Sequence, residues 1–396
     1  MTPSQSSVAA APAKAQSLGD LPEWNLDDLY PGPKSQELAD DFARAEREVA
    51  AFAGEWRGKL ADLAAQPDGG DDLGRAVEAY EALSDLLGRI ASYAMLYYVG
   101  DTDDPERSKF FGDTQGRLTD ISLQLLFFEL EFNRIDDAVM ERALVAPRLA
   151  HYRPWVADLR KERPHQLDDR IEELFHEKSL TGAAAWNRLF DETMSALRFT
   201  VEGETLSLEP TLKLMLDHDG TKRQAAAEAL AETLGANLRL FTQITNTLAK
   251  DKEISDRWHH FEDVTDSRHL ANRVERPVVE ALVSSVQSAY PRLSHRYYAI
   301  KARWLGKDKL AHWDRNAPLP EEDDRQVPWD EAKALVLDAY GGFSPEMARI
   351  AKRFFDGRWI DAPVRPGKAP GAFSHSTVPS AHPYVLLNYQ GKTRDV

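Results

Sequence analysis

Apolar residues recur every three or four positions along much of the first third of the chain, the spacing that places side chains on one face of an α-helix. A first such stretch begins after Ser35, a residue type that caps helices, and a second covers residues 72–98. Asp104 and Pro105 then combine a capping residue with a proline suited to a first helical turn. Apolar positions continue from there to Phe132. The pattern predicts three long helices in succession.

Alternation of apolar and polar residues, the period of a β-strand, occurs first at residues 198–208 around Gly203. It predicts a hairpin that marks a domain junction. From residue 359 to residue 390, Pro, Gly and β-prone residues replace the helical spacing, so further short strands are expected there. We therefore predict a mainly α fold with a few short strands near residues 198–208 and 359–390.

Helical spacing also fills most of the region between these two strand signals. It covers residues 221–252 and 277–305, and Pro291 is expected to bend or restart the second of these helices. Two more helices are expected to begin at Asp330 and at Ser344, where Ser-Pro provides a cap and a first turn.

Composition and charge narrow the classes of partner. The formal net charge is -16, from 65 acidic and 49 basic residues, which argues against binding along a nucleic-acid backbone. The longest apolar runs, such as residues 121–132, are too short to span a membrane. Residues 1–20 are rich in Ala, Ser and Pro and lack the features of a signal peptide, so they are predicted to be a disordered tail. We expect a cytoplasmic protein without nucleic-acid or membrane partners.

The histidines are the first candidates for metal binding, because the chain has no cysteine. His259 and His260 are adjacent, so on a helix their side chains would point roughly 100° apart, whereas zinc ligands on helices usually lie four residues apart. Surface histidines beside acidic residues are the favoured interpretation of this pair.

Two other histidine patterns also fall short of a metal site. The sequence HEKSL at residues 176–180 begins like the zinc motif H-E-x-x-H but has Leu180 where the second histidine belongs. His375 and His382 are separated by Pro379, which breaks a helix, so a hydrogen-bonding or substrate-contact role is favoured for them. Taken alone, these residues provide no complete active site.

The end of the chain carries a series of short motifs in a specific order. They are Arg358-Trp359-Ile360-Asp361, Gly367-Lys368, Gly371-Ala372-Phe373, His382-Pro383-Tyr384, Asn388-Tyr389 and Arg394-Asp395-Val396. This series resembles the segment that precedes the zinc helix in the oligoendopeptidase F family, relatives of thimet oligopeptidase. The resemblance continues backward to residues 21–31 and covers nearly the whole chain after the tail.

The resemblance implies an enzyme that uses one zinc ion to hydrolyse internal bonds of short peptides. In that family a helix with H-E-x-x-H follows, and a glutamate on a later helix completes the zinc site. Asp395 resembles the cap of this zinc helix, and the 396 residues contain no H-E-x-x-H motif, so we expect the chain to be inactive alone. The implied organisation is an N-terminal helical domain over residues 21–200 and an incomplete helical catalytic domain over residues 201–396.

The family also implies a strand near the zinc helix that pairs with an extended oligopeptide substrate through main-chain hydrogen bonds. We expect this strand to be formed by Gly371, Ala372, Phe373, Ser374 and His375. Gly371 would allow close backbone approach. The alternative that the sequence leaves open is a buried strand without a substrate role. Residues 384–389 are expected in the core.

A hypothesis from a different class is a non-catalytic helical binding or scaffold protein derived from a peptidase. It predicts a stable, monodisperse chain. The peptidase hypothesis predicts instead that this chain exposes apolar surface that further parts of the enzyme would cover.

Overall fold

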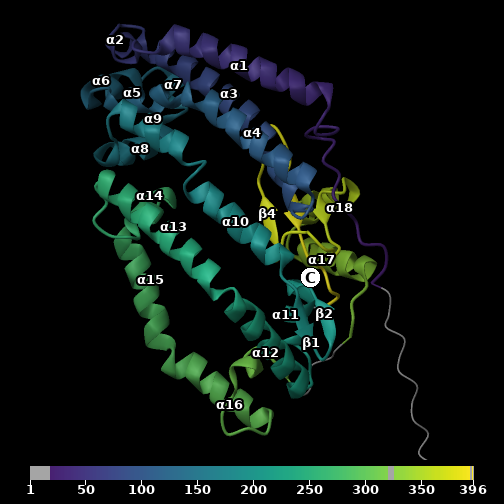
Figure 1. Cartoon of the computed structure of the whole chain (residues 1–396). Helices are drawn as coiled ribbons and strands as arrows, with labels where there is room; N and C mark the ends of the chain where they lie inside the picture. The colour runs from purple at the N-terminus through teal and green to yellow at the C-terminus, as the bar shows by residue number, and fades with distance from the viewer. Residues whose placement is uncertain (1–17, 320–324, 393–394, 396) are drawn as a thin grey trace, which may run out of the picture. The chain divides into compact units, whose positions relative to one another are not determined.

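The computed structural model describes residues 18–319, 325–392 and 395, and it consists mainly of helices with a few short strands (Figure 1). The predicted mainly α fold is confirmed. The chain forms two compact units. The larger unit contains the described parts of residues 26–322 and 365–383, and the smaller unit those of residues 1–25, 323–364 and 384–396. A division into domains near residue 200 stays a prediction.

Helices form most of the larger unit. Its first part consists of α1 (Gln36–Trp56), α2 (Leu60–Ala64), α3 (Gly69–Val99), α4 (Pro105–Leu123), α5 (Leu126–Arg134), α6 (Asp137–Ala143), α7 (Pro147–Ala150), α8 (Arg153–Glu162), the 3-10 helix η1 (Arg163–His165), α9 (Asp169–Lys178) and α10 (Ala183–Ala196). Its second part consists of β1 (Phe199–Val201), β2 (Glu204–Leu206), α11 (Leu208–Leu214), α12 (Gly220–Ala236), α13 (Leu238–Trp258), α14 (Asp266–Ala271), α15 (Arg276–Ala289), the π-helix η2 (Pro291–His295), α16 (Arg296–Trp304), the 3-10 helix η3 (His312–Asp314) and β4 (Phe373–His375).

Two of the predicted helix starts are confirmed by their caps, Ser35 and Asp104. Ser35 Oγ accepts a hydrogen bond of 3.3 Å from the backbone N–H of Leu38, and Asp104 Oδ1 accepts one of 2.8 Å from Glu106. These bonds satisfy N–H groups that have no partner within the first turn of a helix. Pro291 opens the π-helix η2 after the end of α15 at Ala289, so of the predicted bend or restart at this proline the restart is confirmed.

Two of the predicted helices are each divided in the structure. The third predicted helix stops at Leu123 and restarts as α5, and the helix predicted over residues 221–252 is split between α12 and α13 at Asn237. At Asn237 the side-chain amide donates to the carbonyl oxygen of Thr233 over 2.9 Å, an alternative to continued helix. At the first break, Arg57 donates to the carbonyl oxygen of Gln124 over 2.9 Å. The apolar spacing continues across both breaks and therefore did not reveal them.

An aromatic core joins α1, α3 and α5. The ring of Phe128 is fully buried, and its centroid lies 5.2 Å from that of Phe52 and 4.6 Å from that of Tyr80. Phe132 follows one turn later, with its ring centroid 5.7 Å from that of Phe128. These rings fix one face of α5, so the opposite face of this helix is held in place for the cavity described below.

The predicted hairpin is confirmed. Strands β1 and β2 pair antiparallel, with Phe199 opposite Leu206. Glu202 and Gly203 between them have φ values of 50° and 88°, as in the two-residue turns that match the twist of paired strands.

The smaller unit contains α17 (Trp329–Phe343), α18 (Pro345–Asp356), β3 (Ile360–Asp361) and β5 (Tyr384–Leu386). Strands β3 and β5 pair parallel, with Ile360 opposite Val385. The Tyr389 hydroxyl donates to the carbonyl oxygen of Val327 over 2.7 Å. Tyr384 is fully buried and Tyr389 nearly so, which confirms the core position of this segment.

The ends of the described chain bear on two predictions. The carbonyl oxygen of Leu18 accepts a hydrogen bond of 2.8 Å from Trp329 in the smaller unit, whereas residues 1–17 of the predicted tail lie outside the described residues. The Asp395 carboxylate accepts hydrogen bonds from the N–H groups of Gln390 and Lys392. The residues beside Asp395 are not described, so its capping role stays a prediction.

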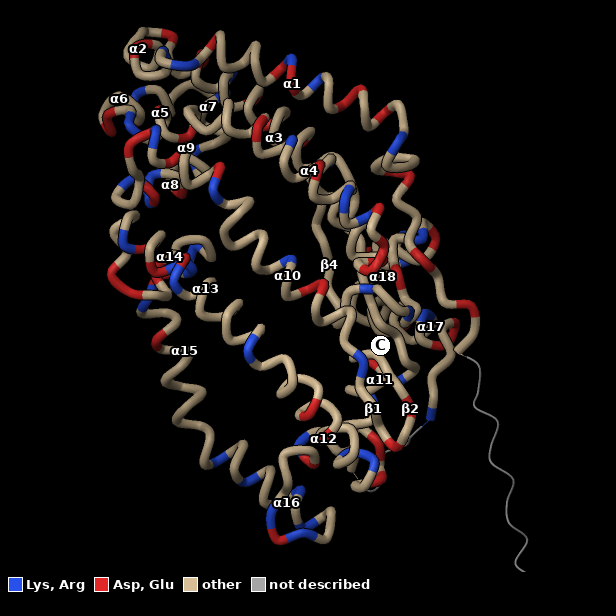
Figure 2. Tube along the Cα trace, in the orientation of Figure 1, with Lys and Arg blue, Asp and Glu red and all other residues tan. Residues whose placement is uncertain are grey.

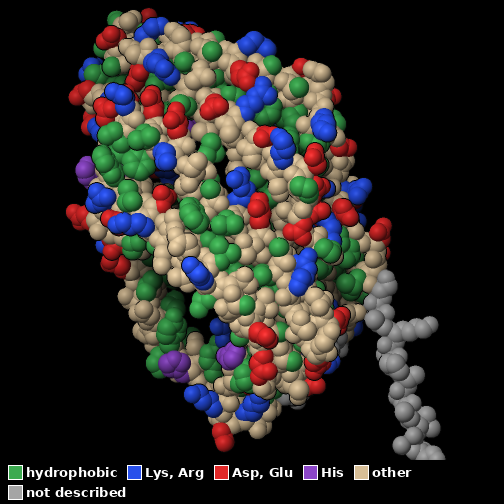
Figure 3. Space-filling model, in the orientation of Figure 1, with side chains coloured by type: hydrophobic (Ala, Val, Ile, Leu, Met, Phe, Trp, Pro, Cys, Tyr) green, Lys and Arg blue, Asp and Glu red, His purple; other side chains and the backbone are tan. Residues whose placement is uncertain are grey.

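The surface of the larger unit is mixed in charge and partly apolar. Acidic and basic residues are interspersed along α1 and α4 (Figure 2). Helix α15 exposes apolar side chains, which give the green surface over this helix in Figure 3; they are Val278, Leu282, Val283 and Val286. None of the helices in the described part of the chain combines the length and apolar character needed to cross a membrane.

Candidate functional site

The predicted peptide-binding residues belong to a segment of the larger unit, residues 367–380, that runs antiparallel along α3. We call it the α3-bound segment. At its start the N–H of Ala369 donates to the carbonyl oxygen of Val99 over 2.9 Å. At its end the N–H of Ser380 donates to Asp85 Oδ1 over 3.1 Å. The segment is therefore fastened at both ends to a single long helix.

The middle of the α3-bound segment is held by a histidine. His375 Nε2 lies 2.9 Å from Ser92 Oγ on α3, and Ser92 is buried. Burial lowers the pKa of His375, which favours the neutral imidazole near pH 7. A Cβ atom added to Gly88 would lie 2.6 Å from Val378 Cγ1, so glycine at this position allows the segment to lie close against the helix.

The structure places Phe373–His375 in strand β4, as the sequence predicted, and Gly371 and Ala372 immediately before it. Gly371 has φ +79°, a backbone conformation that favours glycine, and its N–H donates to Glu209 Oε1 over 2.7 Å. Phe373 and His375 are partly buried, whereas Ala372 and Ser374 are exposed. The strand is thus present, and its role in binding peptides stays a prediction.

Two other histidines singled out in the sequence, His382 and His176, form hydrogen bonds. His382 Nε2 lies 2.9 Å from Asp28 Oδ2, and His176 Nε2 lies 2.8 Å from Ser122 Oγ. The contact of His382 agrees with the hydrogen-bonding role that the sequence favoured for it.

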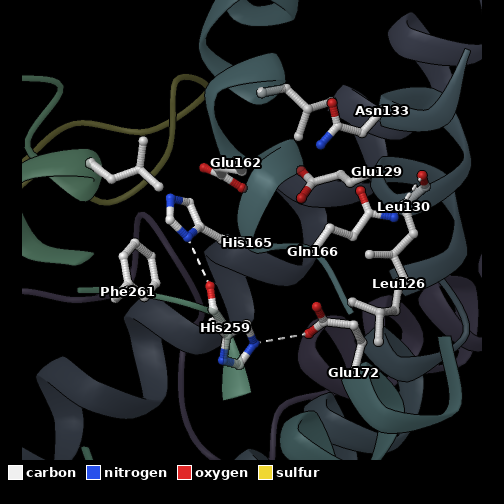
Figure 4. A pocket seen from close by; sticks show the side chains of 12 residues that line it. Leu126, Glu129, Leu130, Asn133, Glu162, His165, Gln166, Glu172, His259 and Phe261 are labelled. Atoms are coloured by element: carbon white, nitrogen blue, oxygen red, sulfur yellow. Dashed lines mark hydrogen bonds and ion pairs between the residues drawn. The ribbon is translucent and has the colours of Figure 1, made fainter. Parts of the chain in front are cut away.

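A second candidate site is a cavity of about 280 Å³ within the larger unit (Figure 4). It is lined by helices α5, α8 and α9, by η1, and by residues after α13. The lining side chains are Leu126, Glu129, Leu130, Asn133, Leu159, Glu162, His165, Gln166, Glu172, His259, Phe261 and Leu270.

One wall of the cavity contains a histidine–carboxylate pair. His259 Nδ1 donates to the carbonyl oxygen of Ser255 over 2.8 Å, while Nε2 lies 3.4 Å from Glu172 Oε2. Both ring nitrogens therefore face acceptors, an arrangement that favours the doubly protonated ring. The hydrogen bond to Glu172 accordingly raises the pKa of His259. His259 lies beside an acid as expected, but it is partly buried rather than on the surface because α9 faces it.

His165 lines the same wall of the cavity, next to the backbone of His259. Its Nδ1 donates to the carbonyl oxygen of His259 over 2.8 Å, and its ring stacks on Phe261 at a centroid distance of 3.9 Å. This bond requires a proton on Nδ1.

Two further carboxyl groups face the cavity. Burial raises the pKa of Glu129, although a hydrogen bond of 3.0 Å from the Tyr80 hydroxyl acts in the opposite direction. Partial burial, together with the nearby Glu129, also raises the pKa of Glu162. Carboxyl groups with raised pKa values in a cavity are typical of functional sites, though structural networks also produce them.

Sequence reasoning did not identify Glu129, Glu162 or His165. A signal was nevertheless present. Glu129 and Asn133 are four residues apart on α5, so they occupy one helical face. What the spacing did not show is that Glu162, His165 and Gln166, at and after the end of α8, meet this face.

Neither site offers ligands for a metal ion. In residues 18–319, 325–392 and 395, no three or more His, Asp or Glu side chains are grouped so that they could hold one. The described residues therefore do not fit a zinc centre of their own.

The family of the chain is shown by comparison with known proteins. A family profile described as oligopeptidase F matches residues 131–199, and one described as peptidase family M3 matches residues 213–396. Together the two matches span more than half of the chain, and they confirm the resemblance identified from the sequence.

Two curated relatives agree with these profiles. The chain is 26% identical over 400 residues to oligopeptidase PepF of Bacillus subtilis (strain 168), in a match that covers 97% of this chain and 58% of the relative. It is 26% identical over 330 residues to group B oligopeptidase PepB of Streptococcus agalactiae serotype III (strain NEM316), covering 82% and 54%. The chain thus spans little more than half the length of these relatives.

The fold is also similar to that of a solved oligoendopeptidase. The crystal structure of oligoendopeptidase-F from Enterococcus faecium superposes with a TM-score of 0.65 at 20% identity, covering 82% of this chain and 66% of that one. Profiles, relatives and fold agree, and the chain belongs to peptidase family M3.

Proposed function

We propose that this chain supplies the peptide-binding part of a zinc-dependent endopeptidase that hydrolyses internal bonds of short peptides. Membership of a peptidase family and relatives named oligopeptidases support the reaction class. The observation that carries the proposal is the α3-bound segment, which is fastened to α3 at three points and leaves Ala372 and Ser374 exposed.

This geometry suits the binding of extended peptides. A substrate that pairs with β4 through main-chain hydrogen bonds would be held in one register whatever its side chains are. Because α3 already holds the segment in place, little conformational entropy is lost when a peptide binds. In this proposal Gly371, Ala372, Phe373, Ser374 and His375 form the peptide-binding strand.

Zinc enters the proposal through residues other than those described. When bound in such an enzyme, zinc polarises the scissile carbonyl group and lowers the pKa of its bound water. The described residues offer no ligand set for it, so no catalytic step is assigned to them. Their proposed task is to bind and orient the peptide.

The reaction class is tested by peptide cleavage. We expect the purified 396-residue chain to cleave no internally quenched short peptide, with or without added zinc, because it contains no H-E-x-x-H motif. A longer product of the same gene that carries this motif should cleave the peptide, lose activity with a chelator and regain it with zinc. Circular dichroism provides the folding control for both proteins.

Two results would count against this proposal. Chelator-sensitive cleavage by the 396-residue chain would show that its metal ligands have been missed. A longer product without the motif, or without activity, would favour the alternative of a non-catalytic binding protein.

The peptide-binding strand is tested separately by hydrogen exchange. In the longer protein, a bound non-cleavable peptide should slow amide exchange at residues 372–375 by about fivefold, since each new backbone hydrogen bond contributes about 1 kcal/mol. The hairpin at residues 199–206 serves as the control and should not change. Unchanged exchange at residues 372–375 while the peptide is bound would remove these residues from the substrate site.

A further inference from the structure

We propose that the cavity in Figure 4 is a binding site for a small organic cation, an alkylammonium or alkylguanidinium group whose apolar stem lies against the leucine-lined wall. The proposal concerns a site distinct from the α3-bound segment and does not depend on peptide cleavage.

The first observation is a surplus of hydrogen-bond acceptors. Gln166 Nε2 donates to the carbonyl oxygen of Leu130 over 3.0 Å, which fixes the orientation of this side-chain amide. Its Oε1 atom is buried and accepts no hydrogen bond from the described residues. Buried acceptors without a donor cost free energy, so a ligand that brings N–H groups would be stabilised here.

The second observation is the carboxamide of Asn133. This residue is only 3% exposed and lines the cavity, and its Oδ1 atom also has no hydrogen-bond partner among the described residues. Figure 4 shows the carboxamide beside Glu129, with Glu162 across the same space. Rotation about the terminal bond exchanges the oxygen and the nitrogen, so the oxygen can face the cavity.

The third observation is the sign of the charge. Glu129 has one oxygen bonded to Tyr80, and no ion pair joins Glu129 or Glu162 to a basic side chain among the described residues. Arg273 is the cation that acts on both carboxyl groups, but its Nε atom is paired with Asp158 over 3.2 Å. Glu129 is partly buried and Glu162 is exposed, so a cation in the cavity would offset the negative charge of both carboxyl groups.

The size and walls of the cavity indicate an organic cation. A volume of about 280 Å³ is several times the ~30 Å³ share of one water molecule. The lining combines leucine side chains with carboxyl groups and amides. A cation with a short alkyl chain satisfies both surfaces at once.

The remaining charged groups are compatible with such a ligand. His259 and Glu172 form an ion pair, so their charges largely offset each other. His165 donates from Nδ1 to the carbonyl oxygen of His259.

The test uses n-butylguanidinium as the probe and n-butylurea as its uncharged analogue of the same shape. Isothermal titration calorimetry on the 396-residue chain should show binding of the cation and none of the urea. In the double variant Glu129→Gln/Glu162→Gln, the Kd of the cation should rise by about tenfold or more, since charge-assisted hydrogen bonds are lost. Glutamine at position 129 still accepts from Tyr80, so the core contact is retained.

The control variant is Glu173→Gln/Glu177→Gln, which removes the same charge from exposed positions of α9. This control matters because a chain of net charge -16 attracts cations without a specific site. It should bind n-butylguanidinium as the unaltered chain does. Equal weakening in both double variants, equal binding of n-butylurea, or no binding by the folded unaltered chain would each overturn the proposal.

Discussion

Replacement of Arg223 by methionine is expected to lower the free energy of unfolding of the larger unit by about 3–5 kcal/mol, because it leaves a buried carboxylate without its main partner. Arg223 Nη2 lies 2.7 Å from Asp314 Oδ1, and the two side chains are 3% and 0% exposed. Nη1 of the same guanidinium donates to the carbonyl oxygens of Asp217 and His218 over 2.7 and 2.9 Å. One side chain therefore connects α12 to η3 and to the turn before α12.

Urea unfolding followed by circular dichroism measures this effect. The matched control is Arg349→Met, which removes an exposed ion pair with Glu346 and should change the free energy of unfolding by less than about 1 kcal/mol. Similar small losses for the two variants would mean that the buried pair contributes no more than a surface pair.

The effect of Arg223→Met should depend on pH. Burial by itself would raise the pKa of Asp314. The pKa nevertheless lies below its usual value, because Arg223, Lys307 and the N–H of Ala311 donate hydrogen bonds to the carboxylate. A carboxyl group whose pKa is lower in the folded state contributes stability above its unfolded pKa of about 3.9 and loses it as the pH falls through the folded value. The difference in the free energy of unfolding between the variant and the unaltered chain should reach its full size near neutral pH. It should shrink below about pH 4.

Replacement of Phe128 by alanine is expected to lower the free energy of unfolding by about 3–5 kcal/mol, because it removes a fully buried ring and leaves a cavity. The ring contacts Phe52 on α1, Tyr80 on α3 and Phe132 on α5. Contacts from three helices limit how far the core can collapse to fill the space. Phe128 precedes Glu129 on α5, so the variant should also loosen the cavity wall.

The same urea unfolding experiment applies, with Phe343→Ala as the control. Phe343 is 85% exposed in the smaller unit, and its truncation should change stability by less than about 0.5 kcal/mol. A loss for Phe128→Ala no larger than this would show that the aromatic core is loosely packed.

Most of the helices could be predicted because their signals are local. Ser35 and Asp104 cap the helices that follow them, and Gly203 permits the hairpin turn, whatever the rest of the chain does. The breaks at Gln124 and Asn237 were missed because the apolar stripe keeps its phase across them. Only the hydrogen bonds made there show that the helix stops.

The two candidate sites were likewise predictable only in part. Residues 371–375 were identified by their resemblance to a family, and the strand at Phe373–His375 was expected. That α3 holds this segment could not be predicted, since Ser92 and His375 are 283 residues apart in sequence. The cavity was missed for the same reason: its acidic side chains lie on separate helices whose packing is set by apolar residues on their other faces.

The sequence by itself determined the helical class, the positions of caps and turns, and the family, because each depends on residue types at short spacing or in a specific order. Tertiary structure alone decided which polar side chains meet, namely His375 with Ser92, Glu172 with His259, and Arg223 with Asp314. The physical reason is that burial of the apolar faces sets how the helices pack. Contacts between the polar faces follow from that packing rather than from any pattern along the chain.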